Sequence, residues 1–297
     1  MQERKRRLGD RKDGYLVREI DSMHAIMPYM LPNRADNEAF LTETVDMTKV
    51  IEYIAKKNSD NPEFKYTFFH FITAAIAKTI VLRPKMNRFY SGHRLYDRKD
   101  IILSFTVKKQ FNDSSEEALA IIKIDPDSDT APIDQVYEQV KKIVFNVRKQ
   151  NNTDESTQKM DILLKMPRPI LRCAVRFLRW LEYHGKYPKS LMKADPYYST
   201  VFISNLGSIK MSADYHHLAN WGTNSIFAII GEMKPMPFYS EDGTVTVKKG
   251  LTISMTIDER IADGFYFANS IKILRKMFDN PELIDEPISA PIDKENR

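Results

Sequence analysis

The order of apolar and polar positions predicts helices that alternate with strands along most of the chain. Residues 68–82 are nearly all apolar and stop before Pro84, which is typical of a buried helix. Apolar residues at helical spacing predict further helices, one beginning after Asp46 or Thr48 and others over residues 134–148, 169–183 and 265–278. Short apolar runs predict strands at residues 101–107, 118–124, 199–204, 225–230 and 251–257. Residues 236–249 fit a connecting hairpin that turns at Asp242-Gly243. This mixture predicts an α/β or α+β fold with a mixed central sheet.

Length and composition are those of a folded globular protein. The chain has 297 residues, of which 42% are hydrophobic and 29% charged. Since no repeat or Gly/Ser linker divides it, we predict a basic flexible arm over residues 1–13, a single domain over 14–285 and a tail over 286–297. The net charge of +5 is a mild excess that permits an anionic ligand, such as a coenzyme phosphate, and does not require nucleic acid.

The termini and the cysteine content indicate a reducing compartment. The first residues are charged with no apolar stretch behind them, and no apolar run approaches the roughly 20 residues of a membrane span. We therefore expect a cytoplasmic protein with no membrane partner. Cys173, the one cysteine, excludes an internal disulfide and a cysteine-rich zinc site. It lies among apolar residues of a predicted helix, which favours a buried, inert thiol over a catalytic one.

Several common catalytic motifs are missing. The ten glycines are spaced too widely for G-x-G-x-x-G, and the one G-x-x-x-x-G, from Gly9, is followed by Tyr15 where a P-loop has lysine. There is no G-x-S-x-G, and no histidine spacing fits a metal site, so we predict no metal. His70 lies inside the apolar helix and is expected to be a core residue. Dehydrogenase and NTPase functions lose their main support.

Two segments place polar groups and a glycine directly after a predicted strand, where substrates are commonly bound. One is Ser204-Asn-Leu-Gly-Ser-Ile209 with the following residues 215–222, and the other is Asp258-Glu-Arg-Ile-Ala-Asp-Gly264. A cluster typical of a pocket floor follows the first, and it consists of His216, His217, Asn220, Trp221, Thr223 and Asn224. The simpler alternatives are a plain turn at Ser204-Asn205 and a packing role for the two histidines.

The predicted helix over 169–183 has a cationic side. Arg172, Arg176 and Arg179 lie on or near one face of it. Such a stripe fits the phosphates of a coenzyme or an acidic partner, and it equally fits an ordinary solvated helix face.

The segment from Asp258 to Gly264 resembles the D-H-R-x-x-D-G signature of the 2-oxoacid dehydrogenase acyltransferase catalytic domain, whose fold is that of chloramphenicol acetyltransferase. Upstream, Val201-Phe-Ile-Ser-Asn-Leu-Gly207 is similar to the F-T-I-S-x-x-G strand end of that family, and Ser225 to Gly231 is similar to its next strand. Earlier, Glu43 to Lys49 resembles its E-V-D-V-T turn, and residues 68–87 resemble its long helix and P-x-L-N element.

The resemblance implies a two-layer, chloramphenicol acetyltransferase-like fold with a central mixed sheet flanked by helices. It also implies a homotrimer with active sites between subunits, a coenzyme A thioester as co-substrate, no covalently bound cofactor and a small-molecule acyl acceptor. Ser204 falls where the family's serine stabilises the tetrahedral oxyanion. Asp263 falls where a structural aspartate pairs with an arginine, here Arg18 or Arg34, and Gly264 allows the strand-to-helix turn.

One position departs from the family pattern, because Glu259 stands where the family has its catalytic histidine. Ordinary glutamates have pKa values near 4.3 and thiols near 8.5, so a glutamate base needs burial to raise its pKa. His217 or His216 is the alternative base. Trp221, Asn220, Thr223 and Tyr266 are candidates to line the substrate channel.

Three function classes follow from these features. The first is an acyl-coenzyme A-dependent acyltransferase with an atypical base. The second is a catalytically inactive trimeric scaffold or binding protein of the same fold. The third, a nucleic-acid binder using the basic arm, has no recognition motif to support it. No lipoyl segment is expected before the domain.

Overall fold

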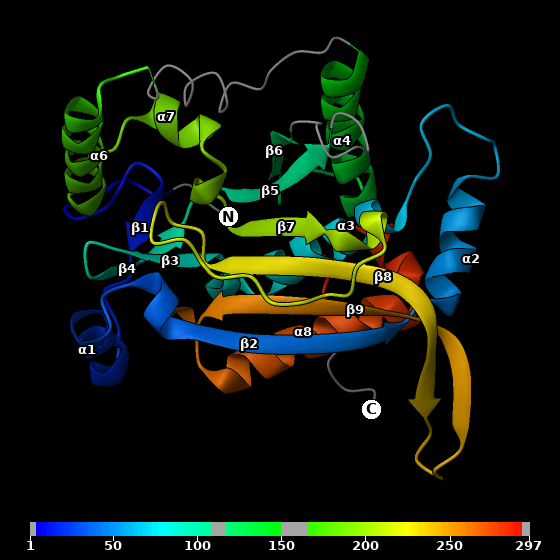
Figure 1. The fold of residues 1–297 in the computed structure, drawn as a ribbon. Coiled ribbons are helices and arrows are strands. Elements are labelled where there is room, and N and C mark those ends of the chain that lie inside the picture. Colours follow the sequence, from blue (N-terminus) through cyan, green and yellow to red (C-terminus); the bar gives the residue numbers. More distant parts are fainter. Residues whose placement is uncertain (1–3, 109–116, 150–164, 293–297) are drawn as a thin grey trace.

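A six-stranded mixed sheet forms the centre of the molecule in the computed structural model, which describes residues 4–108, 117–149 and 165–292 (Figure 1). The strand order is β2-β9-β8-β7-β5-β6, and β7 runs parallel to both β5 and β8 while the other neighbours are antiparallel. The strands are β2 (Glu38–Asp46), β5 (Ile101–Lys108), β6 (Glu117–Ile124), β7 (Val201–Asn205), β8 (Ile226–Tyr239) and β9 (Val245–Asp258). The predicted mixed sheet is confirmed.

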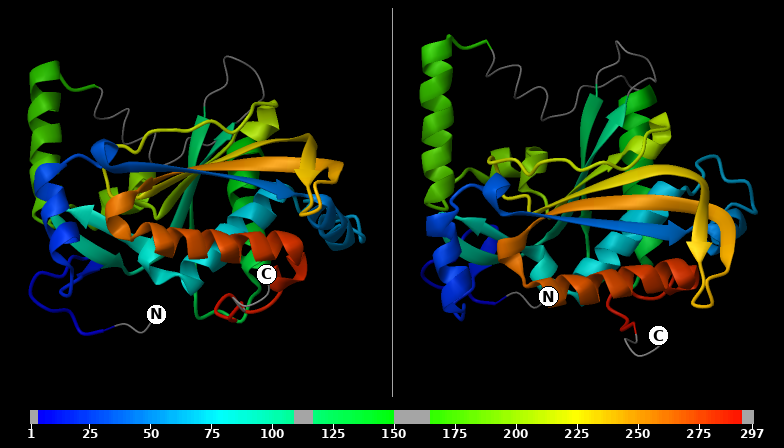
Figure 2. Two further views of the ribbon diagram at one scale, coloured as in Figure 1. Left: turned by 90° about the horizontal axis from the view of Figure 1, so that it is seen from below. Right: turned by 60° about the horizontal axis from the view of Figure 1, so that its bottom comes forward.

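Helices cover one face of this sheet and give the fold its second layer (Figure 2). They are α2 (Thr48–Lys57), α3 (Phe68–Leu82), α4 (Pro132–Lys149) and α8 (Gly264–Asp279). Helix α3 has the predicted bounds and is buried from His70 to Ile80, because its apolar residues surround the whole helix. The main apolar core lies between these helices and the sheet. No helix in the described parts of the chain is both long and apolar enough to cross a bilayer.

A second, three-stranded antiparallel sheet lies at one end of the molecule, in the order β1-β4-β3. Its strands are β1 (Gly14–Leu16), β4 (Arg94–Arg98) and β3 (Arg88–Ser91). The sequence analysis did not predict these short strands, nor the helices α1 (Ser22–Met30) and α7 (Lys189–Ala194). Helix α6 (Arg168–Tyr183) is at the same end.

Both expected appendages make contacts with the domain. Within the expected arm, Asp10 and Arg11 are buried, and the Arg11 guanidinium donates to Asp13 and Ser91. Within the expected tail, Ile288 and Ile292 join the core. The buried ammonium of Lys78 donates to the carbonyl oxygens of three residues near the C-terminal end, which are Leu283, Glu286 and Pro287.

The other face of the sheet holds a smaller apolar cluster of Phe202, Leu218, Phe227 and Ile229. We call this face the open face, because no helix of the second layer covers it. The segment of residues 210–225, yellow in Figure 1, crosses it in front of β7 and β8.

The predicted burial of Cys173 is wrong. Cys173 is exposed, since α6 buries none of its residues, so the expected burial of this thiol is absent. His70 is a core residue as expected: its Nδ1 accepts a hydrogen bond from the Thr67 backbone N–H at 2.9 Å, and burial lowers its pKa to about 4.

Candidate functional site

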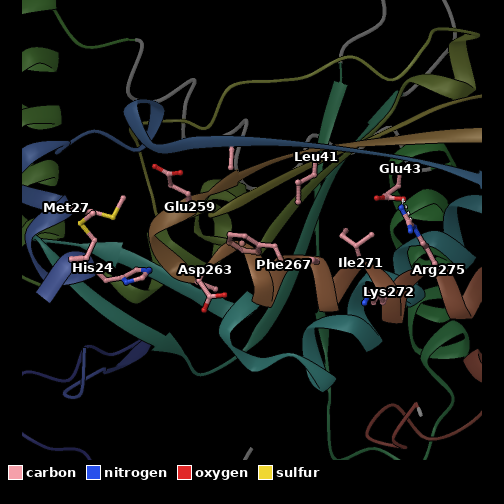
Figure 3. A pocket seen from close by; sticks show the side chains of 15 residues that line it. His24, Met27, Leu41, Glu43, Glu259, Asp263, Phe267, Ile271, Lys272 and Arg275 are labelled. Atoms are coloured by element: carbon pink, nitrogen blue, oxygen red, sulfur yellow. Dashed lines mark hydrogen bonds and ion pairs between the residues drawn. The ribbon is translucent and has the colours of Figure 1, made fainter. Parts of the chain in front are cut away.

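A pocket of about 680 Å³ lies between α1, β2 and α8 (Figure 3). Leu41, Phe267 and Ile271 form its apolar wall. Polar groups stand at its two ends: Glu259, Asp263 and His24 at one, and Glu43, Lys272 and Arg275 at the other. The Arg275 guanidinium binds the Glu43 carboxylate at 2.7 Å, which leaves Lys272 as a cation with no ion-pair partner among the described residues at that end.

Glu259 is the first residue of a 3-10 turn, η5 (Glu259–Ile261), that follows β9 directly. Asp258 caps this turn by accepting a hydrogen bond from the Arg260 backbone N–H. The Glu259 side chain is exposed and lines the pocket, whereas Asp258 and Arg260 on either side of it are buried. Within the described residues no group binds the Glu259 carboxylate, so it is available to a ligand.

The two neighbours of Glu259 form a buried ion cluster that sequence analysis missed. The Asp258 carboxylate receives Nε and Nη2 of Arg260 at 2.8 and 2.7 Å, and Nε of Arg34 lies 3.6 Å from its Oδ2. The Arg34 guanidinium also donates to the carbonyl oxygens of Tyr90, Ala219 and Gly222. Burial lowers the pKa of Arg34 from its ordinary value, and the Asp258 charge opposes that shift. The cluster therefore links three parts of the chain, which are the segment around Arg34, the end of β9 and the segment before β8.

The expected pairing of Asp263 with Arg18 or Arg34 is wrong. Asp263 is exposed and caps α8, accepting a hydrogen bond from the Tyr266 backbone N–H at 2.8 Å that lowers its pKa. Arg34 is taken by Asp258, and Arg18 lies 3.8 Å from Asp10. The expected role of Gly264 is also unsupported, because an added Cβ meets no atom there and its φ is not left-handed.

Ser204 lies near the end of β7 on the open face. Phe202 belongs to the open-face cluster, and residues two apart in a strand point to the same side, so Ser204 shares that face. Its hydroxyl makes no hydrogen bond to another described residue and is free to donate. Asn205 follows it half-buried, and its carbonyl oxygen accepts from the Ser208 hydroxyl.

Ser204 and Glu259 do not meet within one chain. Ser204 is paired with Ile229, and Ile229 with Ser254, so Glu259, the residue directly after β9, lies five residues further along the chain than Ser254. At about 3.3 Å per residue this separates them by about 17 Å along the strand direction alone. A site that uses both residues needs them from different subunits.

The histidine pair lies nearer to Ser204 than Glu259 does in the strand register. The His216 ring stacks on Phe227 with centroids 4.2 Å apart, and Phe227 is the register partner of Phe202. Its Nδ1 is within 3.0 Å of the His217 carbonyl oxygen, and the two imidazoles stack on each other. Both histidines are exposed.

The four residues expected to line the channel do not line the pocket that holds Glu259. Thr223 is fully buried and binds the Arg98 guanidinium through its hydroxyl and its carbonyl oxygen. The Trp221 indole donates to Asp195, and the Tyr266 hydroxyl accepts from the Lys85 backbone N–H. Asn220 accepts from the Ala35 N–H and lines a smaller, neighbouring cavity of about 170 Å³. The polar atoms of Thr223, Trp221 and Tyr266 are therefore bound to other groups of the same chain.

The described residues contain no group of three or more histidine, cysteine, aspartate or glutamate side chains placed to hold a metal ion.

The mixed sheet with helices on one face is the fold of acyltransferase catalytic domains. A probable dihydrolipoamide acetyltransferase from Listeria monocytogenes matches with a TM-score of 0.57 and 16% identity, over 90% of this chain and 95% of that chain. The dihydrolipoamide acetyltransferase of Azotobacter vinelandii matches with a TM-score of 0.57 and 14% identity, over 90% and 93%. A truncated catalytic core of the 2-oxoacid dehydrogenase multienzyme complex from Thermoplasma acidophilum gives 0.53 and 16%, over 90% and 99%. At these identities the similarity establishes the fold.

Residues 188–285 match the family model of the 2-oxoacid dehydrogenases acyltransferase catalytic domain. This range includes Ser204, the segment over the open face and the Asp258–Gly264 motif. The resemblance inferred from the motifs is therefore confirmed. No curated protein sequence matches the chain.

Proposed function

We propose that this protein transfers an acyl group from a coenzyme A thioester to a small-molecule acceptor, in a cytoplasmic homotrimer with active sites between its subunits. One observation carries the proposal: an unpartnered glutamate lines an apolar-walled pocket of about 680 Å³, at the motif position of the family's catalytic histidine. That volume is in the range of small-molecule sites.

The spacing of the polar residues supports the same assignment. The Azotobacter vinelandii structure concerns the role of a serine, a histidine and an asparagine in the catalytic mechanism. Its histidine and asparagine are four positions apart, as Glu259 and Asp263 are. Ser204 precedes Glu259 by a similar interval to that between the serine and the histidine of that protein.

Glu259 is exposed in the single chain, so the burial that a glutamate base needs must come from the adjacent subunit of the proposed trimer. In the proposed reaction, the Glu259 carboxylate then takes the proton of the acceptor as the acceptor attacks the thioester carbonyl carbon. The carbonyl oxygen becomes the oxyanion of a tetrahedral intermediate, and the hydroxyl of Ser204 from the adjacent subunit donates a hydrogen bond to it. When the intermediate collapses, the carbon–sulfur bond breaks and Glu259 returns the proton to the departing thiolate.

The far end of the pocket suits the coenzyme. Lys272 is exposed there, and Arg275 stands beside it in its pair with Glu43. These cations fit the phosphates of coenzyme A. The apolar wall of the pocket would then lie along the part of the coenzyme that carries the thioester to Glu259.

The test is release of free coenzyme A from acetyl- and longer acyl-coenzyme A with hydroxyl, amine and thiol acceptors. Glu259→Gln is expected to lower turnover by about 10²–10⁴-fold and Ser204→Ala by about 10²–10³-fold. Glu241→Gln, an exposed glutamate in the turn between β8 and β9, is the matched control and should have no effect.

Two outcomes contradict the proposal. If Glu259→Gln is mild while His216→Ala or His217→Ala is severe, the base is in the histidine pair on the open face. If the wild-type protein turns over no acyl-coenzyme A with any acceptor, the protein is an inactive scaffold of this fold.

A further inference from the structure

Helix α6 stands apart from both layers of the fold, as an upright helix at one end of the molecule (Figure 2). None of its sixteen residues is buried. In the described structure, neither apolar cluster includes any of its side chains. Its contacts with the domain are at its C-terminal end, where Glu182 binds Arg11 and Ser91 and the Tyr183 ring meets His93. Among the described residues, the rest of the helix makes no hydrogen bond, ion pair or ring contact with another element.

One side of α6 presents a continuous apolar stripe to solvent. Ile170, Cys173, Phe177 and Trp180 recur at intervals of three and four, so they lie along one line of the helix surface. Ile170, Phe177 and Trp180 are each at least half exposed, and the rings of the last two are stacked. Single exposed apolar residues are ordinary, but a stripe of this kind marks a binding surface.

A cationic stripe runs beside the apolar one. Arg168, Arg172, Arg176 and Arg179 are all exposed and, at 3.6 residues per turn, fall in one sector of about 80°. The exposed half of α6 is thus divided lengthwise into arginines and apolar side chains.

The positive charge of the protein is concentrated in this region. Residues 165–194 contain eight lysines and arginines and one acid, Glu182, which is already bound by Arg11 and Ser91. This excess of seven is larger than the +5 of the whole chain, so the remainder is net negative. The small net charge of the whole chain therefore includes one strongly positive segment, residues 165–194.

We propose that α6 docks the protein on the surface of an anionic lipid bilayer. A helix that lies in the headgroup region has apolar aromatic residues on one side and Lys or Arg on the other, which is the division seen here. Phe177 and Trp180 enter the acyl boundary, and the four arginines bind lipid phosphates. The sequence analysis expected no membrane partner because no segment spans a bilayer, but a helix that lies on the surface needs no span.

The charge distribution favours a bilayer over a second copy of this chain. In an antiparallel two-fold contact through the same helix face, the arginine stripes of the two copies would lie on the same side of the contact and repel each other. An anionic surface instead neutralises all four arginines at once. The inference does not depend on the proposed transferase activity.

The experiment is flotation of the full-length protein with vesicles of phosphatidylcholine alone or of phosphatidylcholine with phosphatidylglycerol. We expect binding to the anionic vesicles only, weakened by salt. Arg172→Gln with Arg176→Gln should weaken it roughly 25-fold, about fivefold for each arginine. Phe177→Ser with Trp180→Ser should abolish it. Lipids brominated on their chains should quench the tryptophan emission of the wild type, and Trp180→Phe should remove that quenching.

Matched controls remove the same chemistry elsewhere. Lys141→Gln with Lys142→Gln removes two exposed cations of α4, and Val245→Ser with Val247→Ser removes two exposed apolar side chains of the β8–β9 hairpin. Both pairs should bind vesicles like the wild type. All variants should keep the wild-type melting temperature, since none of these positions contributes to the core.

Three results overturn the proposal. One is no binding to anionic vesicles, and another is equal loss in the α6 variants and their controls. The third is a fall in molar mass, by light scattering without vesicles, on Phe177→Ser with Trp180→Ser, because α6 would then be an interface between copies of this chain.

Discussion

Nε of Arg34 lies 3.6 Å from Oδ2 of Asp258, and both side chains are buried. Since Asp258 also binds Arg260 through two hydrogen bonds, one carboxylate balances two buried guanidinium groups. The residue that immediately follows this carboxylate is Glu259. Stability at this end of β9 therefore depends on Asp258, next to the position proposed for catalysis.

Asp258→Ala should leave Arg34 and Arg260 without their counter-charge, at a cost of about 3–5 kcal/mol in the free energy of unfolding. Urea unfolding followed by circular dichroism measures this loss. Asp263→Ala is the matched comparison and should cost clearly less, since it removes one exposed helix cap. Equal losses from the two variants would show that the ion cluster does not stabilise the fold.

The proposed sharing of sites predicts a specific result for mixed trimers. Glu259→Gln and Ser204→Ala should each be inactive alone, because each removes one half of every site. Random trimers of the two should regain about a quarter of wild-type activity, since about one interface in four pairs an intact Ser204 with an intact Glu259. Mixed trimers as inactive as their parents would place both residues of a working site in one chain, against the strand register.

Shared sites also require a stable oligomer. Size-exclusion chromatography with light scattering should give about three times the chain mass of 34.6 kDa at micromolar concentration. A monomer under these conditions is incompatible with a site built from two subunits.

His70 predicts a pH dependence of stability. Its pKa is about 4 in the folded chain because of burial, against about 6.5 for an ordinary histidine. Below pH 6.5 the unfolded state binds a proton that the native state does not, so the free energy of unfolding should fall between pH 6.5 and 4, by about 3 kcal/mol in total.

His70→Gln is the variant that isolates this contribution. Glutamine keeps an acceptor for the Thr67 N–H and does not titrate. Its free energy of unfolding, measured in urea at several pH values, should depend less steeply on pH between 6.5 and 4. Parallel profiles for the two proteins would mean that His70 does not titrate with unfolding.

Replacing Glu259 by histidine restores the family's usual base. Glu259→His should fold as well as the wild type because the side chain is exposed, and it should gain transfer to a thiol acceptor. The rate of thioester formation and the melting temperature are the two measurements. A fall in melting temperature would mean that Glu259 itself supports the fold.

The elements with strong apolar patterns were predicted from the sequence almost to the residue. Helix α3 is one, because a long apolar run that ends just before Pro84 is typical of a buried helix. The sequence predicts that this strand ends at residue 230, whereas β8 continues to Tyr239. The pattern does not reveal the rest of the strand, because beyond the core it consists largely of exposed residues and includes two prolines. Strands β1, β3 and β4 were missed because they are short and form a small sheet only through distant pairing.

The site was predicted in part for similar reasons. The motif located Glu259, and the structure puts it in a pocket. The pairing of Arg34 was assigned to the wrong aspartate because Asp258 and Asp263 are five residues apart, and burial, which separates them, is not visible in the sequence. The feature of the sequence that points to Asp258 is its position two residues before Arg260, because an aspartate and an arginine at this spacing can form an ion pair across a turn.

The ion cluster at Asp258 has a consequence for how motifs of this kind relate to activity. In the segment from 258 to 260 the fold requires the first and third side chains, while the second is free to vary. If Glu259 is the base proposed above, a chain of this fold can change its proton acceptor in one substitution and keep both residues of the ion cluster. Similarity in this motif therefore indicates a shared fold. The chemistry has to be established separately, from the identity of the side chain between the two residues that the fold requires.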